Sequence, residues 1–475
     1  MKKGLTIVLV ILFAVILQAC DTLLTPGEET NKNFNIEPFE RLFDDSKVKT
    51  LNVKITQEKW DELDLKMVEY YDRFEHYRTD YMIEGELEYS DDEGSITIKD
   101  IGFRTRGNYS RDRIQNDVGH LNPNNFKLSF HEDYDPVNVD RTVFELEEID
   151  LKYNRNWDST YLTEKYSLDL FQSIGVFAAE TTLVRLIITI GDEEHYYGVY
   201  TAFEPIDDNF IKRRLTKEES QGNLYKSLWQ MYGPANLGYP ITSGAIGMKS
   251  EATNYRPAYD LKTNKKNPNH DTLRQFIKDI NQKDGSEFET YIEANFDVDM
   301  FLKYLAVGVL LGNPDDYRAM GNNYYLYQNS KTNKWMIIPY DYDHGLGQGW
   351  DGDPVFTNWT IGANIYTWGN LNSHQLGVEN YPHVLVDKIL NIPTYQVQYE
   401  AYLAQLIDIN QGDFNTTSFM LLYNEQHTLY DHLIEGAMIP QRFGLRNVID
   451  YIEGKRSDID GQLSYYVDHP NERGF

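Results

Sequence analysis

The chain has 475 residues, of which 74 are acidic and 45 are basic, so its formal net charge at pH 7 is −29. This acidic excess argues against a nucleic-acid-binding surface, because contact with phosphates needs clustered lysine and arginine. The length allows one large domain of two lobes or two to three ordinary domains.

The N-terminus has the pattern of an export signal. Lys2 and Lys3 precede an apolar run over residues 5–17, which has the length of a secretory signal and is short for a membrane span. Cys20, the only cysteine, follows in the stretch LQAC, which resembles a bacterial lipobox. We predict that residues 1–20 are a lipoprotein signal peptide, that a lipid on Cys20 anchors the exported protein to the cell membrane, and that residues 21–45 are a polar tether. The alternatives are a plain cleaved signal and an uncleaved anchor.

Residues 46–204 are predicted to be mostly β-structure. Alternating apolar and polar residues predict short strands over residues 48–55, 81–89, 95–106, 125–130, 145–151, 182–190 and 196–201. Helical spacing occurs over residues 57–74 and 160–174.

Helices dominate residues 205–475. Apolar spacing predicts them over residues 207–214, 271–281, 298–311, 381–390, 394–409, 417–434 and 445–453. Residues 233–266 are rich in Gly, Asn, Tyr and Pro, and we expect an insertion or a lid there, with disorder as the alternative. A β-rich half followed by a helical half predicts an α+β fold of two lobes with a cleft between them.

Residues 321–347 are predicted to form a hairpin that ends in carboxylates. Two strands flank a polar turn, and residues two apart in an extended segment point to the same side. Asp341 and Asp343 would then present both carboxylates in one direction, where they either repel each other or share a cation.

Several short motifs keep the order and spacing of one known family. The chain resembles the spore-coat protein H (CotH) kinase family over about residues 48–347, through GFRTRGN (102–108), LTEK (162–165), DLF (169–171), YGVY (197–200), FE (203–204), GNLYK (222–226), NNYY (322–325) and PYDYD (339–343). The resemblance implies a two-lobed, protein-kinase-like fold and an atypical kinase that uses ATP and Mg²⁺. It further implies that the substrates are secreted or spore-coat proteins, phosphorylated mainly on serine.

Phosphoryl transfer needs cations that hold phosphate oxygens. Arg104 and Arg106 lie on one face of a predicted strand that turns at GN (107–108), so they are candidates for this role; pairing with surface carboxylates is the alternative. Lys127 is a further candidate, although its strand pattern also suits a lysine in water. Glu164 shares a helix face with apolar residues and needs a cationic partner, unless it reaches water at the edge of that face.

The Lys–Glu ion pair of kinase-like sites suggests that Lys127 and Glu164 pair beside the nucleotide. By resemblance, Glu204 lies near the adenine, and a plain hinge residue is equally consistent with its position.

The spacing of a kinase catalytic loop assigns the remaining roles. Asp316 precedes Asn322 by six residues and is our predicted base, with Asp315 as the second choice. Mg²⁺ takes oxygen ligands, so we assign it to Asp341 and Asp343 with Asn322 or Asn323. A structural calcium site or a capped hairpin is the alternative.

The predicted function is an exported, membrane-tethered atypical kinase that phosphorylates Ser or Thr of secreted or surface proteins. One rival is a non-catalytic, kinase-like adhesin or scaffold. The other is a glycoside hydrolase, which needs two carboxyl groups that flank a sugar and no nucleotide.

Overall fold

The computed structural model describes residues 34–350, 357–369, 383–434 and 443–474, except residues 109, 155 and 157. The predicted signal peptide with Cys20, and residues 21–33 of the predicted tether, lie outside these ranges. The rest of the predicted tether is folded: it contains β1 (Phe34–Ile36) and α2 (Phe39–Phe43), and Leu42 is fully buried. Within the described part of the chain, no helix is both long and apolar enough to cross a membrane.

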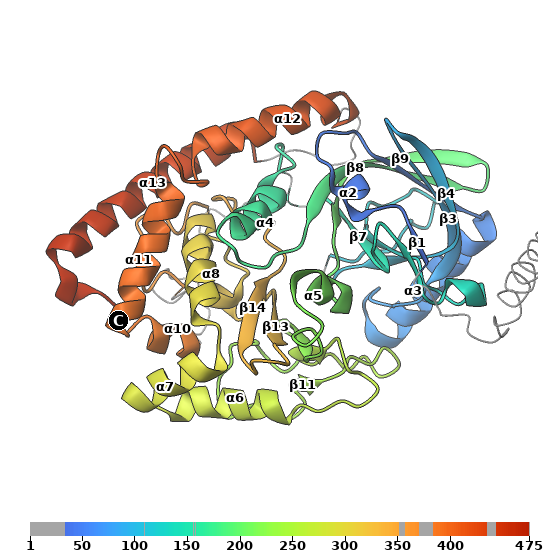
Figure 1. Cartoon of the computed structure of the whole chain (residues 1–475). Coiled ribbons are helices and arrows are strands. Elements are labelled where there is room, and N and C mark those ends of the chain that lie inside the picture. Colours follow the sequence, from blue (N-terminus) through green and yellow to red (C-terminus); the bar gives the residue numbers. More distant parts are fainter. Residues whose placement is uncertain are drawn as a thin grey trace, which may run out of the picture.

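Strands from the first half of the chain close into a barrel, on the right in Figure 1. Leu51, Val53 and Ile55 alternate with polar residues along β2 and point into the barrel core. Around the barrel the strands are β2 (Thr50–Ile55), β3 (Ile83–Asp91), β4 (Gly94–Arg106), β5 (Asn125–Ser129), β7 (Glu148–Tyr153), β9 (Glu193–Phe203) and β8 (Thr181–Ile190). The closure joins β2 to β8 in parallel, and local strand patterns do not predict such a distant pairing.

Helix α3 (Gln57–Phe74) covers the barrel. Thr56 caps its start by accepting a hydrogen bond from Lys59 N at 3.2 Å, and Trp60, Leu63 and Met67 lie on one buried face at helical spacing. Smaller elements near the barrel are β6 (Arg141–Val143), which pairs with β1, and the 3-10 turn η1 (Pro136–Asn138).

The second half of the chain contains a sheet of its own. Its order is β11 (Ile246–Gly247), β12 (Tyr259–Leu261), β10 (Leu224–Ser227), β13 (Tyr324–Gln328) and β14 (Trp335–Pro339). The predicted hairpin is confirmed as β13 and β14. The other strands were missed because they have only two to four residues each, and β11 and β12 lie in the segment predicted as a lid.

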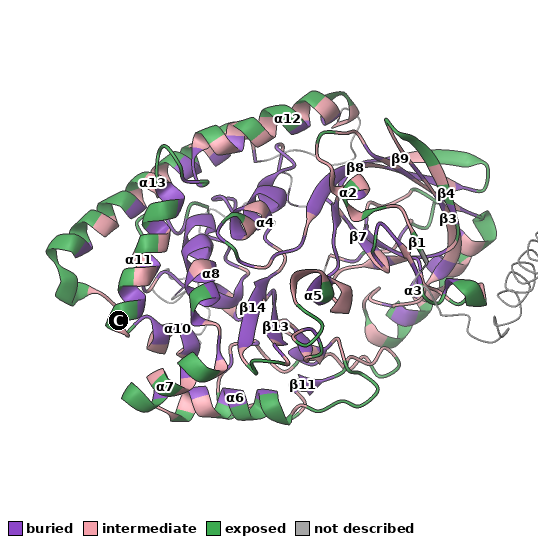
Figure 2. Ribbon diagram, in the orientation of Figure 1, coloured by how far each residue is buried: buried purple, intermediate pink, exposed green. Residues whose placement is uncertain are grey.

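Helices surround this sheet. Helix α8 (Val298–Leu311) is buried on nearly all sides, as Figure 2 shows, and packs against α11 (Pro393–Ile407) and β14. The helices are α5 (Asp208–Arg214), α6 (Asp271–Gln282), α7 (Gly285–Asn295), α8 (Val298–Leu311), α9 (Tyr317–Met320), α10 (Val384–Ile389), α11 (Pro393–Ile407), α12 (Thr416–Ile434), α13 (Leu445–Asp468) and the 3-10 turn η3 (Pro470–Glu472).

The short helices α2 and α9 were not predicted, and two of the longer helices differ from the sequence prediction. Helix α7 was missed because its buried face consists of little more than Phe288 and Ile292. Helix α13 continues to Asp468, beyond the predicted end at residue 453, because Gly454 and Gly461 weaken the helical pattern without ending the helix.

Helix α4 (Thr163–Ser173) belongs to the barrel half by sequence but packs into the core of the helical half. The ring of Phe171 lies 5.4 Å from that of Tyr304 and 4.8 Å from that of Tyr342, measured between centroids. Residues at the start of α4 are therefore held beside the segment that follows β14. The mixed α and β content agrees with the predicted α+β class.

Candidate active site

A cavity of about 910 Å³ is lined by residues of both the barrel and the second half of the chain. This volume is at the upper end of the range for small-molecule sites, about 300–1,000 Å³. Among the residues predicted to bind nucleotide or metal or to act as base, only Asp316 does not line the cavity. Those that do are Arg104, Arg106, Lys127, Glu164, Glu204, Asp315, Asn322, Asn323, Asp341 and Asp343.

The barrel wall of the cavity is polar because strand residues alternate between two faces. In β7, Glu148, Asp150 and Lys152 line the cavity, while Ile149 and Leu151 are buried in the barrel core. The same strand thus supplies a core face and a charged face.

Strand register arranges these polar side chains in rows across the wall. Directly opposed residues on neighbouring strands share a face and lie about 4.8 Å apart in the pairing direction. One row contains Arg104, Lys127, Asp150 and Phe203 on β4, β5, β7 and β9, and the next contains Arg106, Asn125, Lys152 and Thr201.

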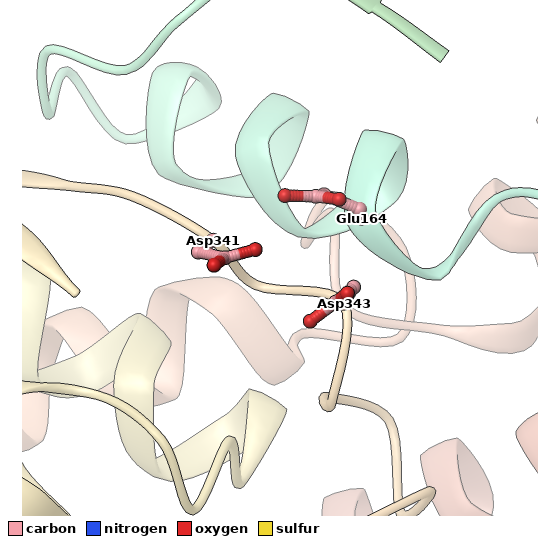
Figure 3. Close-up of side chains that lie close together, drawn as sticks. All are labelled: Glu164, Asp341 and Asp343. Atoms are coloured by element: carbon pink, nitrogen blue, oxygen red, sulfur yellow. The ribbon is translucent and has the colours of Figure 1, made fainter. Parts of the chain in front are cut away.

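Three carboxylates gather around one ammonium group at the end of this wall. Glu164 comes from the first turn of α4, while Asp341 and Asp343 come from the segment after β14, as Figure 3 shows. Lys152 Nζ lies 2.8 Å from Glu164 Oε2 and 2.8 Å from Asp343 Oδ2, and it also donates to Asp341 Oδ1. One lysine therefore links the barrel, α4 and the second half of the chain.

This cluster carries more negative charge than its lysine can neutralise. Burial raises the pKa of Glu164 to about 8, although Lys152 opposes the shift. Burial also disfavours the charged form of Lys152, but Asp341 and Asp343 outweigh it and hold the pKa of Lys152 well above its usual value. When all three carboxylates are ionised, they and the ammonium group have a net charge of −2, which a divalent cation would neutralise.

The donor atoms fit a small hard cation. Oxygens of Glu164, Asp341 and Asp343 all lie within 4.8 Å of one another. Ligands on opposite sides of a Mg²⁺ ion are about 4.2 Å apart, since each Mg–O bond is about 2.1 Å, so small side-chain movements suffice. The backbone supports this placement: Asp341 has a φ of 62°, and Asn313 Nδ2 donates to its carbonyl at 3.1 Å.

Asp315 lies beside this cluster and is held by both predicted asparagines. Asn322 Nδ2 donates to Asp315 Oδ1 at 2.8 Å, and Asn323 Nδ2 donates to Oδ2 at 2.9 Å. Burial raises the pKa of Asp315 to about 6, with His344 opposing the shift. Asp315 is thus a fixed carboxylate that can accept a proton near neutral pH.

Asp316, the predicted base, caps a helix and does not line the cavity. It is fully buried and caps α9, where its Oδ1 accepts from Ala319 N at 2.9 Å and its Oδ2 accepts from Tyr342 OH at 3.1 Å. The extended backbone at this cap turns its side chain away from the cavity and leaves Asp315 facing it.

The predicted Lys127–Glu164 ion pair is wrong. Lys127 Nζ lies 3.0 Å from Asp150 Oδ1 and also pairs with Glu148, both of which are its neighbours on β7. Glu164 pairs with Lys152, because α4 packs against β8, which lies beyond β7 and β9 on the side away from β5.

The two predicted phosphate-binding arginines line the cavity but have acidic partners. Arg104 lies 3.3 Å from Asp80 Oδ1. Arg106 Nε lies 3.1 Å from Asp150 Oδ1, and its NH2 group donates to Tyr340 OH at 2.6 Å. Their role in binding phosphate stays a prediction.

The carboxylate of Glu204 is fully engaged by protein groups. Arg214 donates to it at 2.8 and 2.6 Å, Arg213 Nε donates at 3.0 Å, and Glu180 N donates at 3.0 Å. The side chain therefore anchors the end of β9 to α5 and is not available to hold a ligand.

Lys152 and Lys226 are among the cavity lysines that were missed in the sequence. Lys152 could have been found from the alternation in EIDLKY, where it shares a face with Glu148 and Asp150. Lys226 ends the GNLYK motif; its Nζ lies 3.9 Å from the ring centroid of Tyr340, and among the described residues none places a carboxylate within ion-pair distance of it. Burial lowers the pKa of Lys226 to about 7, and Arg106 adds to the shift.

Comparison with known proteins identifies one family. The family described as CotH kinase protein matches residues 103–474, which is most of the chain. The match covers the cavity wall from β4 onward and the segments that supply Glu164, Asp315, Asp341 and Asp343.

Individual relatives are distant. The chain is 25% identical to inner spore coat protein H of Bacillus subtilis over 198 residues, which are 41% of this chain and 49% of the relative. It is 23% identical to invasin CotH2 of Rhizopus delemar, over 56% of this chain and 41% of the relative. The chain thus spans about half the length of these relatives or less. A solved structure, the proinflammatory kinase CtkA of Helicobacter pylori, aligns over 75% of this chain and 96% of its own at 13% identity; its TM-score of 0.28 is too low to establish a common fold.

Proposed function

Because the chain belongs to the CotH kinase protein family, we propose that it is an atypical protein kinase that transfers the γ-phosphoryl group of ATP to serine or threonine hydroxyls of secreted or surface proteins. In this proposal the barrel and the helical half act as two kinase-like lobes with the cavity as their cleft. The main support is the cluster in which Lys152 holds Glu164, Asp341 and Asp343 together at the cavity wall.

The cluster has the parts that protein kinases use. A strand lysine pairs with a helix glutamate in those enzymes, and an aspartate and an asparagine hold the metal ions. Lys152 on β7 and Glu164 on α4 supply the ion pair here. We assign Mg²⁺ to Asp341, Asp343 and Asn323, because Asn322 Oδ1 already accepts from Trp229 N at 2.6 Å. When bound, Mg²⁺ neutralises charge on the transferred phosphoryl group.

Asp315 is the residue that we assign to the acceptor. The asparagine bonds fix its carboxylate beside the metal cluster, where it accepts the proton of the serine or threonine hydroxyl as that oxygen attacks phosphorus. Its pKa of about 6 keeps it mostly ionised at neutral pH.

The nucleotide base fits the β9 side of the cavity. Apolar side chains line this side and can pack against a purine ring: Leu168, Ala179, Phe203, Pro205 and Ile206. If the purine base of ATP lies there, its phosphates point toward Lys152, because Lys152 is on β7, one strand away from β9. Lys226 and Arg106 then supply positive charge from the other walls.

Thermal shift with nucleotide tests this function. Mg²⁺ with ATP should raise the Tm of the wild-type protein by several degrees, while Asp341→Asn should lose most of this gain. Phosphotransfer from γ-labelled ATP to a serine-containing protein should fall at least a hundredfold in Asp341→Asn. A wild type that neither gains stability nor transfers phosphate would favour the non-catalytic scaffold.

We also propose that the protein is exported and held at the membrane by a lipid on Cys20. The support is the apolar segment over residues 5–17 followed by the only cysteine. The intact mass of the native protein should correspond to a chain that begins at Cys20 with acyl groups attached. A water-soluble chain that begins elsewhere would contradict the proposal.

A further inference from the structure

The cavity has a second charged cluster, on the opposite side from the nucleotide base. We name it the Asp80 cluster: Asp80, Arg104, Arg111 and Lys249. Arg104 NH1 lies 3.3 Å from Asp80 Oδ1, Arg111 NH2 lies 4.0 Å from the same oxygen, and Lys249 Nζ pairs with Oδ2. One carboxylate thus faces three cationic side chains.

The Asp80 cluster has an excess of positive charge. Arg256 also lines this part of the cavity, and Glu251 accepts from Asp80 N at 2.9 Å, so the charges are four positive and two negative. Burial lowers the pKa of Arg111 to about 9, and Arg104 adds to the shift. Burial also lowers the pKa of Lys249 to about 8, and Asp80 does not fully offset it. In an acidic chain, this is a place that an anion would stabilise.

Arg111 has unused donor capacity. Its side chain is almost fully buried, its NH1 group donates to Thr79 O, and its Nε has no hydrogen-bond partner among the described residues. A buried guanidinium N–H without a partner costs free energy, and a bound anion would remove that cost.

Strand register separates this cluster from the proposed nucleotide site. Phe203 lies on β9 beside the proposed site of the nucleotide base. Arg104 lies in the same row on β4, three strands away, so the backbones of Phe203 and Arg104 are about 14 Å apart. The metal cluster lies beside the next row, where Lys152 is two strands from Arg106. Arg104 and Arg106 are two residues apart on one strand, about 7 Å. The Asp80 cluster is therefore within reach of a chain whose hydroxyl lies at Asp315, and away from the base.

The cluster is also open to a large ligand. The side chains of Asp80 and Lys249 are 24% and 30% exposed. We propose that the Asp80 cluster is an acceptor subsite, which binds an anionic side chain, a carboxylate or a phosphate, a few residues from the hydroxyl that is phosphorylated. This inference rests on the proposed kinase function and adds a class of substrate to it.

Peptide kinetics with the full chain test the subsite. The substrates are serine peptides with neutral flanks, with a glutamate, or with a phosphoserine placed two, three or four residues to either side of the acceptor. The anionic peptides should have a kcat/KM at least tenfold above that of the neutral peptide, mainly through KM. Comparing the glutamate and phosphoserine series identifies which anion the site prefers. Equal values for all peptides would overturn the proposal.

Lys249→Ala is the informative variant, because Lys249 is partly exposed and Asp80 keeps two arginine partners without it. Its kcat/KM for the anionic peptides should fall about five- to tenfold, with the KM for ATP changed less than twofold. A rise in the KM for ATP instead would assign the cluster to the nucleotide and overturn the proposal. Lys54→Ala is the matched control, since Lys54 is a partly exposed lysine that pairs with Glu88 outside the cavity.

Direct binding separates this inference from the kinase function. Fluorescence anisotropy of labelled peptides, without ATP, should show tighter binding of the anionic peptides, and Lys249→Ala should weaken it. If no peptide is phosphorylated but this preference is found, the kinase function fails and the anion subsite stands. If anionic and neutral peptides bind equally, the subsite is wrong whatever the enzyme activity.

Discussion

Asp315 and Asp316 are neighbours in the chain, yet their carboxylates have different surroundings. Asp315 lines the cavity between two asparagines, and Asp316 is a buried helix cap. Asp315→Asn should therefore lower kcat about a hundredfold or more while Mg²⁺-ATP binding persists. Asp316→Asn keeps the cap and should retain transfer within about threefold. Steady-state phosphotransfer decides between them, and a larger loss in Asp316→Asn would return the role of base to Asp316.

Lys152 holds three carboxylates together, so its removal should expose their repulsion. Lys152→Met should lower the Tm by several degrees, and Mg²⁺ alone should restore more stability to this variant than to the wild type, because the cation replaces the ammonium. Thermal unfolding with and without Mg²⁺ measures this.

A buried lysine outside the cavity provides the control. Lys455 is fully buried and pairs with Asp458. Lys455→Met should lower the Tm as well, but without a specific response to Mg²⁺. The same Mg²⁺ response in both variants would show that the cation does not bind at the cluster.

Among the elements of the fold, the start of α4 is held by the side chain of Asp158 in the loop before it. Asp158 Oδ1 accepts from Thr160 N at 2.8 Å, and its Oδ2 accepts from Leu162 N at 3.1 Å and Thr163 N at 3.0 Å. Asp158→Ala would leave Thr160 N and Thr163 N buried without this acceptor, while Leu162 N keeps Thr160 Oγ1 at 3.2 Å, and it should cost about 2–4 kcal/mol of stability. It should also reduce transfer, because α4 carries Glu164.

The cap of α3 is the matched comparison for α4. Thr56 accepts one hydrogen bond, from Lys59 N, so Thr56→Ala should cost about 0.5–2 kcal/mol. Its transfer activity should stay close to that of the wild type. Denaturant unfolding compares the two variants, and equal costs would show that the extra bonds of Asp158 contribute nothing.

Helix α5 should make stability depend on pH. Asp207 caps it by accepting from Phe210 N at 2.9 Å, and burial raises the pKa of Asp207 to about 7 despite this bond. The folded state therefore holds a proton that the unfolded chain releases near pH 4, so this carboxyl costs stability as the pH rises from about 4 to about 7. Asp207→Asn keeps the cap without titrating. Its stability should equal that of the wild type near pH 4 and exceed it by about 1–4 kcal/mol above pH 7.

Unfolding measured between pH 4 and 8 tests the role of Asp207. Asp192→Asn is the control, because Asp192 is an exposed carboxylate in the turn between β8 and β9. A pH-dependent gain in Asp192→Asn, or none in Asp207→Asn, would contradict the prediction.

The C-terminal part of the chain connects the helical half to the barrel. Helix α12 runs from the helical half to the barrel, as Figure 1 shows, and Tyr430 OH donates to Leu183 O at 2.7 Å and accepts from Lys49 N at 3.0 Å. Tyr430→Phe should cost about 1–3 kcal/mol, because both barrel groups are then buried without this partner. Tyr423→Phe on the same helix should cost less than about 0.5 kcal/mol, since Tyr423 stacks on His427 through its ring. If the two substitutions lowered the free energy of unfolding equally, the bonds of Tyr430 would not be what holds α12 to the barrel.

The segment over residues 233–266 also contacts the barrel half. It was expected to be a lid or disordered; the structure shows β11 and β12 in it, and Lys249, Arg256 and Lys262 line the cavity. Its contacts with the barrel half include Glu251, which accepts from Asp80 N. Composition alone could not predict this, because contacts with a distant part of the chain order the segment.

The sequence by itself determined most strands of the barrel, most of the longer helices, the hairpin with Asp341 and Asp343, and many of the polar side chains that line the cavity, although not Lys152. These features depend on local periodicity, which decides the face of a strand or helix on which a residue lies.

Periodicity cannot choose a partner on another element. Lys127 and Lys152 lie on the same face of the barrel, and only the packing of α4 decides that Glu164 meets Lys152. The cap geometry of α9 likewise decides that Asp315, and not Asp316, lines the cavity. The tertiary structure settled these choices because ion pairs and hydrogen bonds act over about 3 Å, a distance that register and packing set and local pattern does not.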